Sequence, residues 1–209
     1  MGKFVVAVCI FASVINLRAE TREVTAASYV ELGDRFAKQE DFVRAIGAYT
    51  LALEFAPNFA PAYFKRGIVR QTRGDFPDAI ADYSKCLEII PQWTEAFYNR
   101  GNLLLKEGDF ERALVDFDKA LQIDPHYFMA YNNRGIAKLG TGDVQGAIAD
   151  FSQAIMINSR DPEAYVNRGL IQWRQGRRIE AERDFARSIA LKPSVRTFIE
   201  ERIGEITQR

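Results

Sequence analysis

Few residues of this 209-residue chain could do chemistry, and they are not grouped as an active site requires. An enzyme needs a nucleophile, an acid–base pair or a metal ion. The single histidine, His126, follows Asp124 and Pro125 with no second histidine or cysteine beside it, so we expect a solvated turn residue. Cys86 stands where equivalent segments of the chain carry alanine. We therefore expect a small buried side chain there rather than a nucleophile.

Carboxylates are plentiful, but four of them recur at one period, and four arginines recur at the same period. The aspartates are Asp82, Asp116, Asp150 and Asp184, and the arginines are Arg66, Arg100, Arg134 and Arg168. Active sites are rarely copied four times, so these two series predict a structural stack of ion pairs between neighbouring helices. The chain has no phosphate-binding glycine loop and no dinucleotide fingerprint. The sequence thus predicts no enzyme, no cofactor, no metal site and no small-molecule substrate.

Composition excludes further classes of protein. Lysine plus arginine and aspartate plus glutamate each number 28, so no excess positive charge draws the chain to nucleic acid or an anionic membrane. Fourteen glycines and seven prolines are too few for a collagen-like or low-complexity chain. Two cysteines cannot form a disulfide framework, and with one histidine they do not suit a structural zinc site. We expect no nucleic-acid partner.

One spacing organises most of the chain. Four sets of residues recur every 34 residues without an insertion or deletion. They are the glycines Gly33, Gly67, Gly101, Gly135 and Gly169; the alanines Ala45, Ala79, Ala113, Ala147 and Ala181; the aromatics Tyr49, Tyr83, Phe117, Phe151 and Phe185; and the aromatics Tyr29, Tyr63, Phe97, Tyr131 and Tyr165. Small residues let two helices approach closely, and aromatic side chains fill the space beside the crossing.

Each 34-residue unit also has a break in its middle and another at its end. Glycines that stop a helix stand in the middle at Gly74, Gly108, Gly142 and Gly176, whereas the first unit has Glu40 there. Prolines that cannot continue a helix stand at the ends at Pro57, Pro91, Pro125 and Pro193, with Ser159 in the fourth unit. Each unit is therefore predicted to be a pair of helices.

These residues resemble the tetratricopeptide repeat (TPR), a helix-turn-helix unit of 34 residues. The resemblance covers residues 26–195 as five repeats and implies an all-α fold, a right-handed superhelical solenoid of helix-turn-helix repeats. Residues 20–25 form a short lead. Residues 196–209 are expected to form a capping helix, because Val195, Ile199, Ile203 and Ile206 form one apolar stripe.

The resemblance also implies that the first helices of the repeats line a concave surface that commonly holds a peptide. Asn99, Asn133 and Asn167 stand two residues before successive repeat glycines, and a primary amide can pair with a peptide backbone of almost any sequence. Neighbouring first helices about 10 Å apart match about three residues of extended peptide. The alternative is that these asparagines join neighbouring helices to each other.

The predicted peptide-binding groove mixes amides with apolar and aromatic side chains. Its residues are Phe64, Lys65, Tyr98, Asn99, Asn102, Asn132, Asn133, Ile136, Asn167, Leu170 and Trp173. Specificity is assigned to Phe64, Tyr98, Ile136 and Trp173. Some members of the family bind acidic C-terminal tails through lysines and arginines, but the comparable positions here hold Tyr98, Glu95, Glu163 and Asn167. A carboxylate-tail clamp is therefore not expected.

The first nineteen residues predict a secretory signal peptide. Lys3 precedes a mostly apolar run from Phe4 to Leu17, and Ala19 suits a cleavage point. The run is shorter than the roughly 20 residues that a membrane-spanning helix needs. Cleavage predicts an extracytoplasmic protein, periplasmic or secreted. An uncleaved anchor, which alone would give membrane contact, and a buried N-terminal helix are the alternatives.

Together these patterns predict an exported, non-catalytic scaffold that binds an extended, partly apolar segment of a partner protein in its concave groove. The alternative function is a structural subunit that self-associates through its ends or its convex face.

Overall fold

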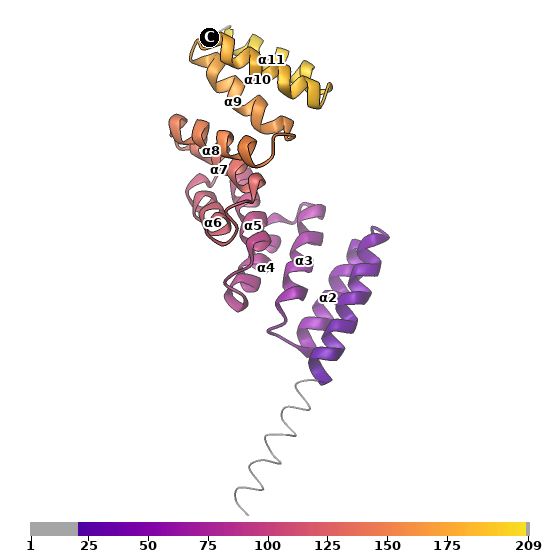
Figure 1. The fold of residues 1–209 in the computed structure, drawn as a ribbon. Helices are drawn as coiled ribbons and strands as arrows, with labels where there is room; N and C mark the ends of the chain where they lie inside the picture. The colour runs from indigo at the N-terminus through magenta and orange to yellow at the C-terminus, as the bar shows by residue number, and fades with distance from the viewer. Residues whose placement is uncertain (1–20, 208–209) are drawn as a thin grey trace, which may run out of the picture. The chain divides into compact units, whose positions relative to one another are not determined.

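In this computed structural model the structure describes residues 21–207, which form helices joined by short turns with no strand in that range (Figure 1). The predicted signal peptide, residues 1–19, lies outside the described residues. The chain divides into two compact units between Ala96 and Phe97. None of the helices described is long and apolar enough to cross a lipid bilayer.

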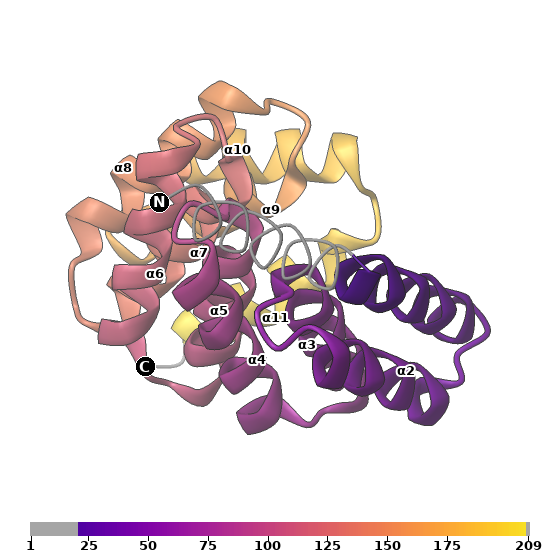
Figure 2. The same cartoon turned by 90° about the horizontal axis from the view of Figure 1, so that it is seen from below.

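The first unit holds two helical pairs. A helix over residues 21–38 pairs with α2 (Phe42–Phe55), and α3 (Ala60–Arg73) pairs with α4 (Phe76–Ile89). In each pair the helices lie side by side (Figure 2), and α3 contacts both α2 and α4. Residues 21–25, expected as a lead, already belong to the first helix. The two pairs are the first two predicted repeats.

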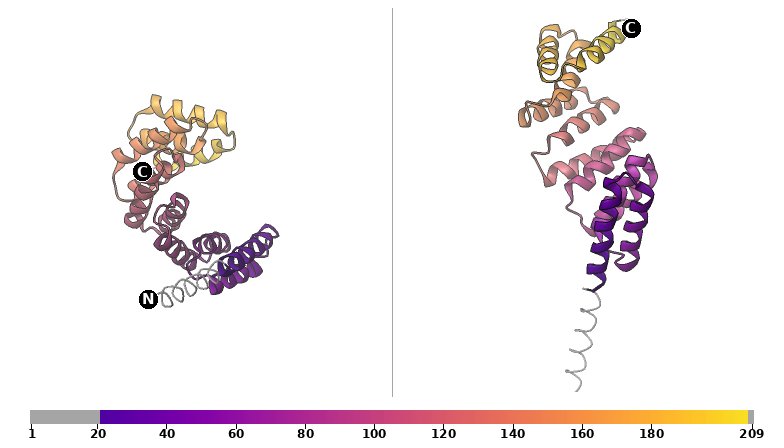
Figure 3. Two further views of the ribbon diagram at one scale, coloured as in Figure 1. Left: turned by 60° about the horizontal axis from the view of Figure 1, so that its bottom comes forward. Right: turned by 90° about the vertical axis from the view of Figure 1, so that its right-hand side faces the viewer.

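The second unit continues the same alternation. Its helices are α5 (Thr94–Glu107, whose first turn precedes the boundary), α6 (Phe110–Ile123), α7 (Phe128–Gly140), α8 (Val144–Ile157), α9 (Pro162–Arg174), α10 (Arg178–Leu191) and α11 (Val195–Thr207). Contacts run from α6 to α7, α7 to α8, α8 to α9 and α9 to α10 (Figure 3). The last helix, α11, packs on α9 and α10, with Ile199 buried at their junction, as the predicted cap requires.

The mid-repeat turns need a left-handed residue, and four of the five repeats supply glycine. Gly74, Gly108, Gly142 and Gly176 have φ of +87°, +81°, +86° and +78°. Glycine has no Cβ and adopts this conformation without strain. The first repeat makes the same turn with Glu40 at φ +57°.

The repeat glycines lie where the two helices of a pair cross. A Cβ built on Gly135 would lie 2.8 Å from Cε1 of Phe151 and 2.9 Å from Cζ of the same ring. The Phe151 side chain is fully buried against α7, so the ring cannot easily withdraw. Gly67, Gly101 and Gly169 meet Tyr83, Phe117 and Phe185 in the same way. The predicted role of the small residues is confirmed.

The ion-pair stack is also confirmed, and its geometry is specific. The Arg134 guanidinium on α7 donates through Nε and Nη2 to both carboxylate oxygens of buried Asp150 on α8, at 2.8 and 2.7 Å. Its third nitrogen, Nη1, donates to Asp118 on the preceding second helix, α6, at 2.7 Å. Each such arginine can therefore join two second helices. The equivalent pairs within repeats are Arg66–Asp82, Arg100–Asp116 and Arg168–Asp184.

His126 and Cys86, the two residues first considered for chemistry, lie in an exposed turn and in the buried core respectively. His126 is exposed in the turn between α6 and α7, where its backbone N–H donates to Oδ1 of Asp124 at 2.9 Å. The Cys86 side chain is fully buried on α4, and burial raises the pKa of its thiol to about 12. Both outcomes match the expectation from sequence.

Candidate peptide-binding surface

A chain of side-chain amides connects the first helices of repeats three to five. Asn167 on α9 donates through Nδ2 to Oδ1 of Asn132 on α7 at 3.0 Å, and Asn132 donates to Oδ1 of Asn133 at 3.2 Å. Asn133 donates in turn to Oδ1 of Asn102 on α5 at 2.6 Å and to the Tyr98 hydroxyl at 3.3 Å. We call the surface that these five residues form together with Asn99 on α5 the first-helix face.

The amide chain changes what two of the predicted groove residues can do. Asn132 was expected on an exposed column, but its side chain is only 4% exposed, because it lies between α7 and α9 with both its amide atoms bonded. The Asn133 amide uses its nitrogen on α5 and its oxygen on Asn132. At these two positions the asparagines therefore join neighbouring helices to each other, as the alternative interpretation of the sequence required.

Two amides on the first-helix side keep hydrogen-bonding capacity. Asn99 on α5 is half-buried and makes no side-chain hydrogen bond in the part of the chain that the structure describes. Oδ1 of Asn167 likewise accepts no hydrogen bond from residues 21–207, since the contact of this side chain runs through its nitrogen. One free amide and one free acceptor remain for a ligand.

Aromatic and aliphatic side chains flank the amides. The Tyr98 ring packs edge-on against Tyr127, with centroids 4.9 Å apart, and tilts against Phe117 at 6.2 Å. Burial raises the pKa of the Tyr98 hydroxyl, so this group stays a neutral donor and acceptor. Ile136 is partly buried against the core cluster that contains Phe151.

A cavity of about 730 Å³ lies where α7 and α9 meet the turn before α8 and the end of α11. Its lining consists of Leu139, Gly142, Val144, Gln145, Asn167, Leu170, Ile171, Arg174, Gln175 and Ile206. Of these, only Asn167 and Leu170 belong to the predicted groove. Arg174 follows Leu170 by four residues on the same helix face, which the spacing could have indicated. Ile206 comes from the cap, and no local pattern places it beside α7.

Trp173 lies elsewhere than its predicted role implies. It packs in the cluster formed by α9, α10 and α11, where its ring tilts against Phe185 at a centroid distance of 6.2 Å. The Arg178 guanidinium lies 3.6 Å from the Trp173 ring centroid, and the ring does not line the cavity. This contact holds the start of α10 on the end of α9.

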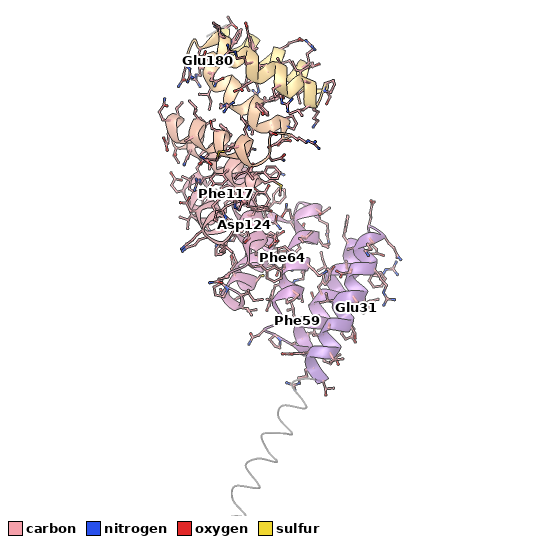
Figure 4. All side chains as sticks on the ribbon, viewed as in Figure 1. Glu31, Phe59, Phe64, Phe117, Asp124 and Glu180 are labelled. Carbon is pink, nitrogen blue, oxygen red and sulfur yellow. The ribbon has the colours of Figure 1, made fainter. Side chains whose placement is uncertain are left out.

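The remaining predicted residues, Phe64 and Lys65, lie on α3 in the first unit (Figure 4 labels Phe64). The Phe64 ring stacks on Trp93 with centroids 4.6 Å apart. Nζ of Lys65 donates to Oδ2 of Asp34 at 2.7 Å, so its charge is already paired. Across residues 21–207 no group of three or more histidine, cysteine, aspartate or glutamate side chains is arranged to hold a metal ion.

Paired helices of constant spacing, tied by repeated ion pairs and crossing at small residues, define a helical-repeat protein. Tetratricopeptide repeat models match residues 30–92, 94–127 and 162–195, and a TPR repeat model matches residues 140–176. The chain belongs to the tetratricopeptide repeat family, as five repeats followed by a capping helix, and is a non-enzymatic protein-interaction scaffold. No curated protein matches it in sequence.

Solved structures share the fold. A crystal structure of MamA is 26% identical, with a TM-score of 0.73 over 78% of this chain and 95% of its own. MamA from Desulfovibrio magneticus RS-1, from residue 41 to its end, is 20% identical, with a TM-score of 0.76 over 81% of this chain and 96% of its own. YrrB, described as a TPR protein with an unusual peptide-binding site, is 21% identical, with a TM-score of 0.69 over 79% of this chain and 85% of its own. The last two similarities concern the fold alone.

Proposed function

We propose that this scaffold binds an extended, partly apolar segment of a partner protein along the first-helix face of the second unit. The observation that supports the proposal is that the cavity shares Asn167 with the amide chain. An apolar wall of Leu139 and Leu170 thus lies beside a free hydrogen-bond acceptor. Such a combination suits a peptide whose backbone N–H meets the amide oxygen while a side chain enters the apolar space.

In this proposal the asparagines divide into two groups. Asn133 and buried Asn132 fix the spacing of α5, α7 and α9 through the amide chain. Asn99 and Asn167 keep free polar atoms and contact the partner's backbone. YrrB, which shares the fold, is described as a TPR protein with an unusual peptide-binding site, and peptide binding is the mode of recognition that we propose for this chain.

The division can be tested with peptides selected from a random twelve-residue display library on the immobilised full chain. We expect Asn99→Ala to weaken binding of a selected peptide with little change in melting temperature. Asn133→Ala should lower the melting temperature, because it leaves partners on α5 and α7 unbonded. Met156→Asp on α8, an exposed second-helix position, is the matched control and should do neither. If the selected peptides bind the Asn99→Ala variant normally but no longer bind the Met156→Asp variant, binding on the first-helix face is refuted.

Self-association is the second candidate function, and exposed apolar side chains on second helices favour it. Val43 on α2, Met156 on α8 and Ile179 on α10 are 71%, 71% and 66% exposed. If these surfaces join copies, sedimentation velocity should show a mass that rises with concentration and falls on Met156→Asp. A constant monomer mass would exclude this function.

Export through residues 1–19 belongs to the same proposal. The intact mass of the protein isolated from its source cells should correspond to a chain that begins at Glu20. A mass that includes any of residues 1–19 would contradict cleavage after Ala19.

A further inference from the structure

The cavity of the second unit has mostly aliphatic walls contributed by four elements. Leu139 comes from α7, Val144 from α8, Leu170 and Ile171 from α9, and Ile206 from the cap α11. Leu139 and Val144 are exposed, whereas Ile171 in the same lining is buried. A volume of about 730 Å³ lies within the roughly 300–1,000 Å³ of ligand sites. An apolar side chain entering this space would remove those walls from water.

The only charged side chain of the lining is Arg174, and it has no partner. It is exposed and makes no hydrogen bond or ion pair with any residue that the structure describes. Two other cations close in sequence to lining residues already have partners. Lys138, next to Leu139, pairs with Asp150, and Arg177, two residues after Gln175, pairs with Glu180. An uncompensated guanidinium at the edge of an apolar cavity favours a carboxylate in the ligand.

The spacing along α9 gives the register. Asn167, with its free Oδ1, and Arg174 are seven residues apart, about 10 Å along the helix axis. An extended peptide covers that distance in about three residues. The backbone N–H that meets Asn167 and the carboxylate that meets Arg174 therefore belong to residues about three positions apart, with the cavity beside the stretch between them.

We propose that this cavity is the anchor site of the scaffold, and that it takes an apolar side chain lying within about three residues of an acidic one in the partner segment. This inference rests on the proposed function and deepens it, because it names the chemistry of the segment. It also gives the cap a part in recognition, since Ile206 of α11 completes the wall. Here a single guanidinium on one helix binds one carboxylate. This differs from the clamp in which several lysines and arginines bind an acidic C-terminal tail.

The experiment uses acetylated, amidated copies of the selected peptides, so that no free terminal carboxylate is present. Their affinities for the full chain and its variants are measured by fluorescence anisotropy. Arg174→Glu should weaken binding about tenfold, and changing the peptide's acidic residue to lysine should restore it. Arg160→Glu, the same charge change in the turn before α9 and about 20 Å from Arg174, should alter affinity by less than about twofold.

The apolar part of the site is tested separately. Ile206→Ala should weaken peptides that carry a large apolar residue and leave alanine-substituted peptides unaffected. Leu139→Ser, at an exposed wall position, gives the same comparison if Ile206→Ala lowers the melting temperature.

Three results would overturn the inference, and each identifies a different error. Peptides that bind Arg174→Glu as well as wild type but lose affinity on Asn99→Ala would leave the first-helix face intact and exclude the cavity. Failure to select any peptide would refute the cavity and the proposed function together. A concentration-dependent mass that Leu139→Ser abolishes would show that a second copy of the chain occupies the cavity instead.

Discussion

Replacing Glu40 with glycine should stabilise the first repeat. Glu40 makes the mid-repeat turn at φ +57°, where the other four repeats have glycine at φ between +78° and +87°. An L-residue in the left-handed region costs about 1–2 kcal/mol. Glycine loses about 0.4–1 kcal/mol more backbone entropy on folding. The exposed Glu40 side chain makes no hydrogen bond or ion pair in the described part of the chain, so no contact is lost. The expected net gain is about 0.5–1 kcal/mol.

The gain should be local, because a repeat array need not unfold in one cooperative step. Hydrogen exchange of amides in residues 21–38 and in α2 is therefore the appropriate assay. A gain of this size slows exchange through local opening about two- to fivefold. Amides in α8 provide an internal reference and should exchange at unchanged rates.

Gly74→Glu is the matched reverse substitution in the same unit. Nothing lies within 4 Å of a Cβ at this position, so the strain of φ +87° is isolated from any clash. Exchange in α3 and α4 should become faster. Unchanged or faster exchange in the first repeat of Glu40→Gly, with no effect of Gly74→Glu, would refute the argument from backbone conformation.

Three further substitutions, and two measurements on the Cys86 thiol, test other features. Gly135→Ala should lower the free energy of unfolding by about 1–3 kcal/mol, because the new methyl group lies 2.8 Å from a buried phenyl carbon. Gly47→Ala, with open space around it on α2, should raise it by about 0.5–1 kcal/mol, both measured by urea titration. The Cys86 thiol, whose pKa burial raises to about 12, should resist thiol reagents at pH 8 until the chain unfolds. Because the unfolded thiol has a pKa of about 8.5 and loses its proton first, stability should fall as the pH rises from about 8.5 toward 12. Asp150→Ala should lower the free energy of unfolding by about 3–5 kcal/mol, since it leaves the Arg134 guanidinium without its bidentate partner.

Each of these expectations has a control that could contradict it. Equal effects of alanine at Gly135 and Gly47 would show that helix propensity, rather than the crossing, decides the outcome. The thiol measurement uses a Cys9→Ser background so that one cysteine reports, and rapid labelling in native conditions would exclude a buried Cys86. Asp118→Ala removes the exposed partner of the same arginine and should cost no more than about 1 kcal/mol.

The periodic features could be predicted from sequence because each repeat makes the same contact independently. Gly135 and Phe151 recur with the repeat, so their approach at a helix crossing follows from the pattern. The pairing of Arg134 with Asp150 follows from two series of opposite charge at one period. Burial of Cys86 followed from the alanines in its column.

The candidate site was harder to predict, because it depends on features that occur once. Whether an asparagine faces solvent or a neighbouring helix depends on interhelical distance and on the partner's side chain. Asn132 is buried because Asn167 and Asn133 lie within hydrogen-bonding distance of it. The cavity also depends on the cap, which occurs once and contributes Ile206 to its wall. Its cation, Arg174, stands at a position that varies among the repeats and that holds Lys38, Thr72, Lys106 and Gly140 in the other four.

The ion-pair stack has a consequence for how the length of this protein can change. Arg134 reaches Asp118, which lies 16 residues before it on the preceding second helix, and Arg168 reaches Ser152 across the same separation. If residues 128–161 were excised, Asp118 would lie 16 residues before Arg168, and Asn102 would lie 31 residues before Asn167, as it now does before Asn133. A gene deletion or duplication of 34 codons would therefore bring equivalent residues together at the junction, whereas a length that is not a multiple of 34 codons would misalign the contacts across it. The chain can gain or lose whole repeats in evolution while its ends, cap included, stay unchanged.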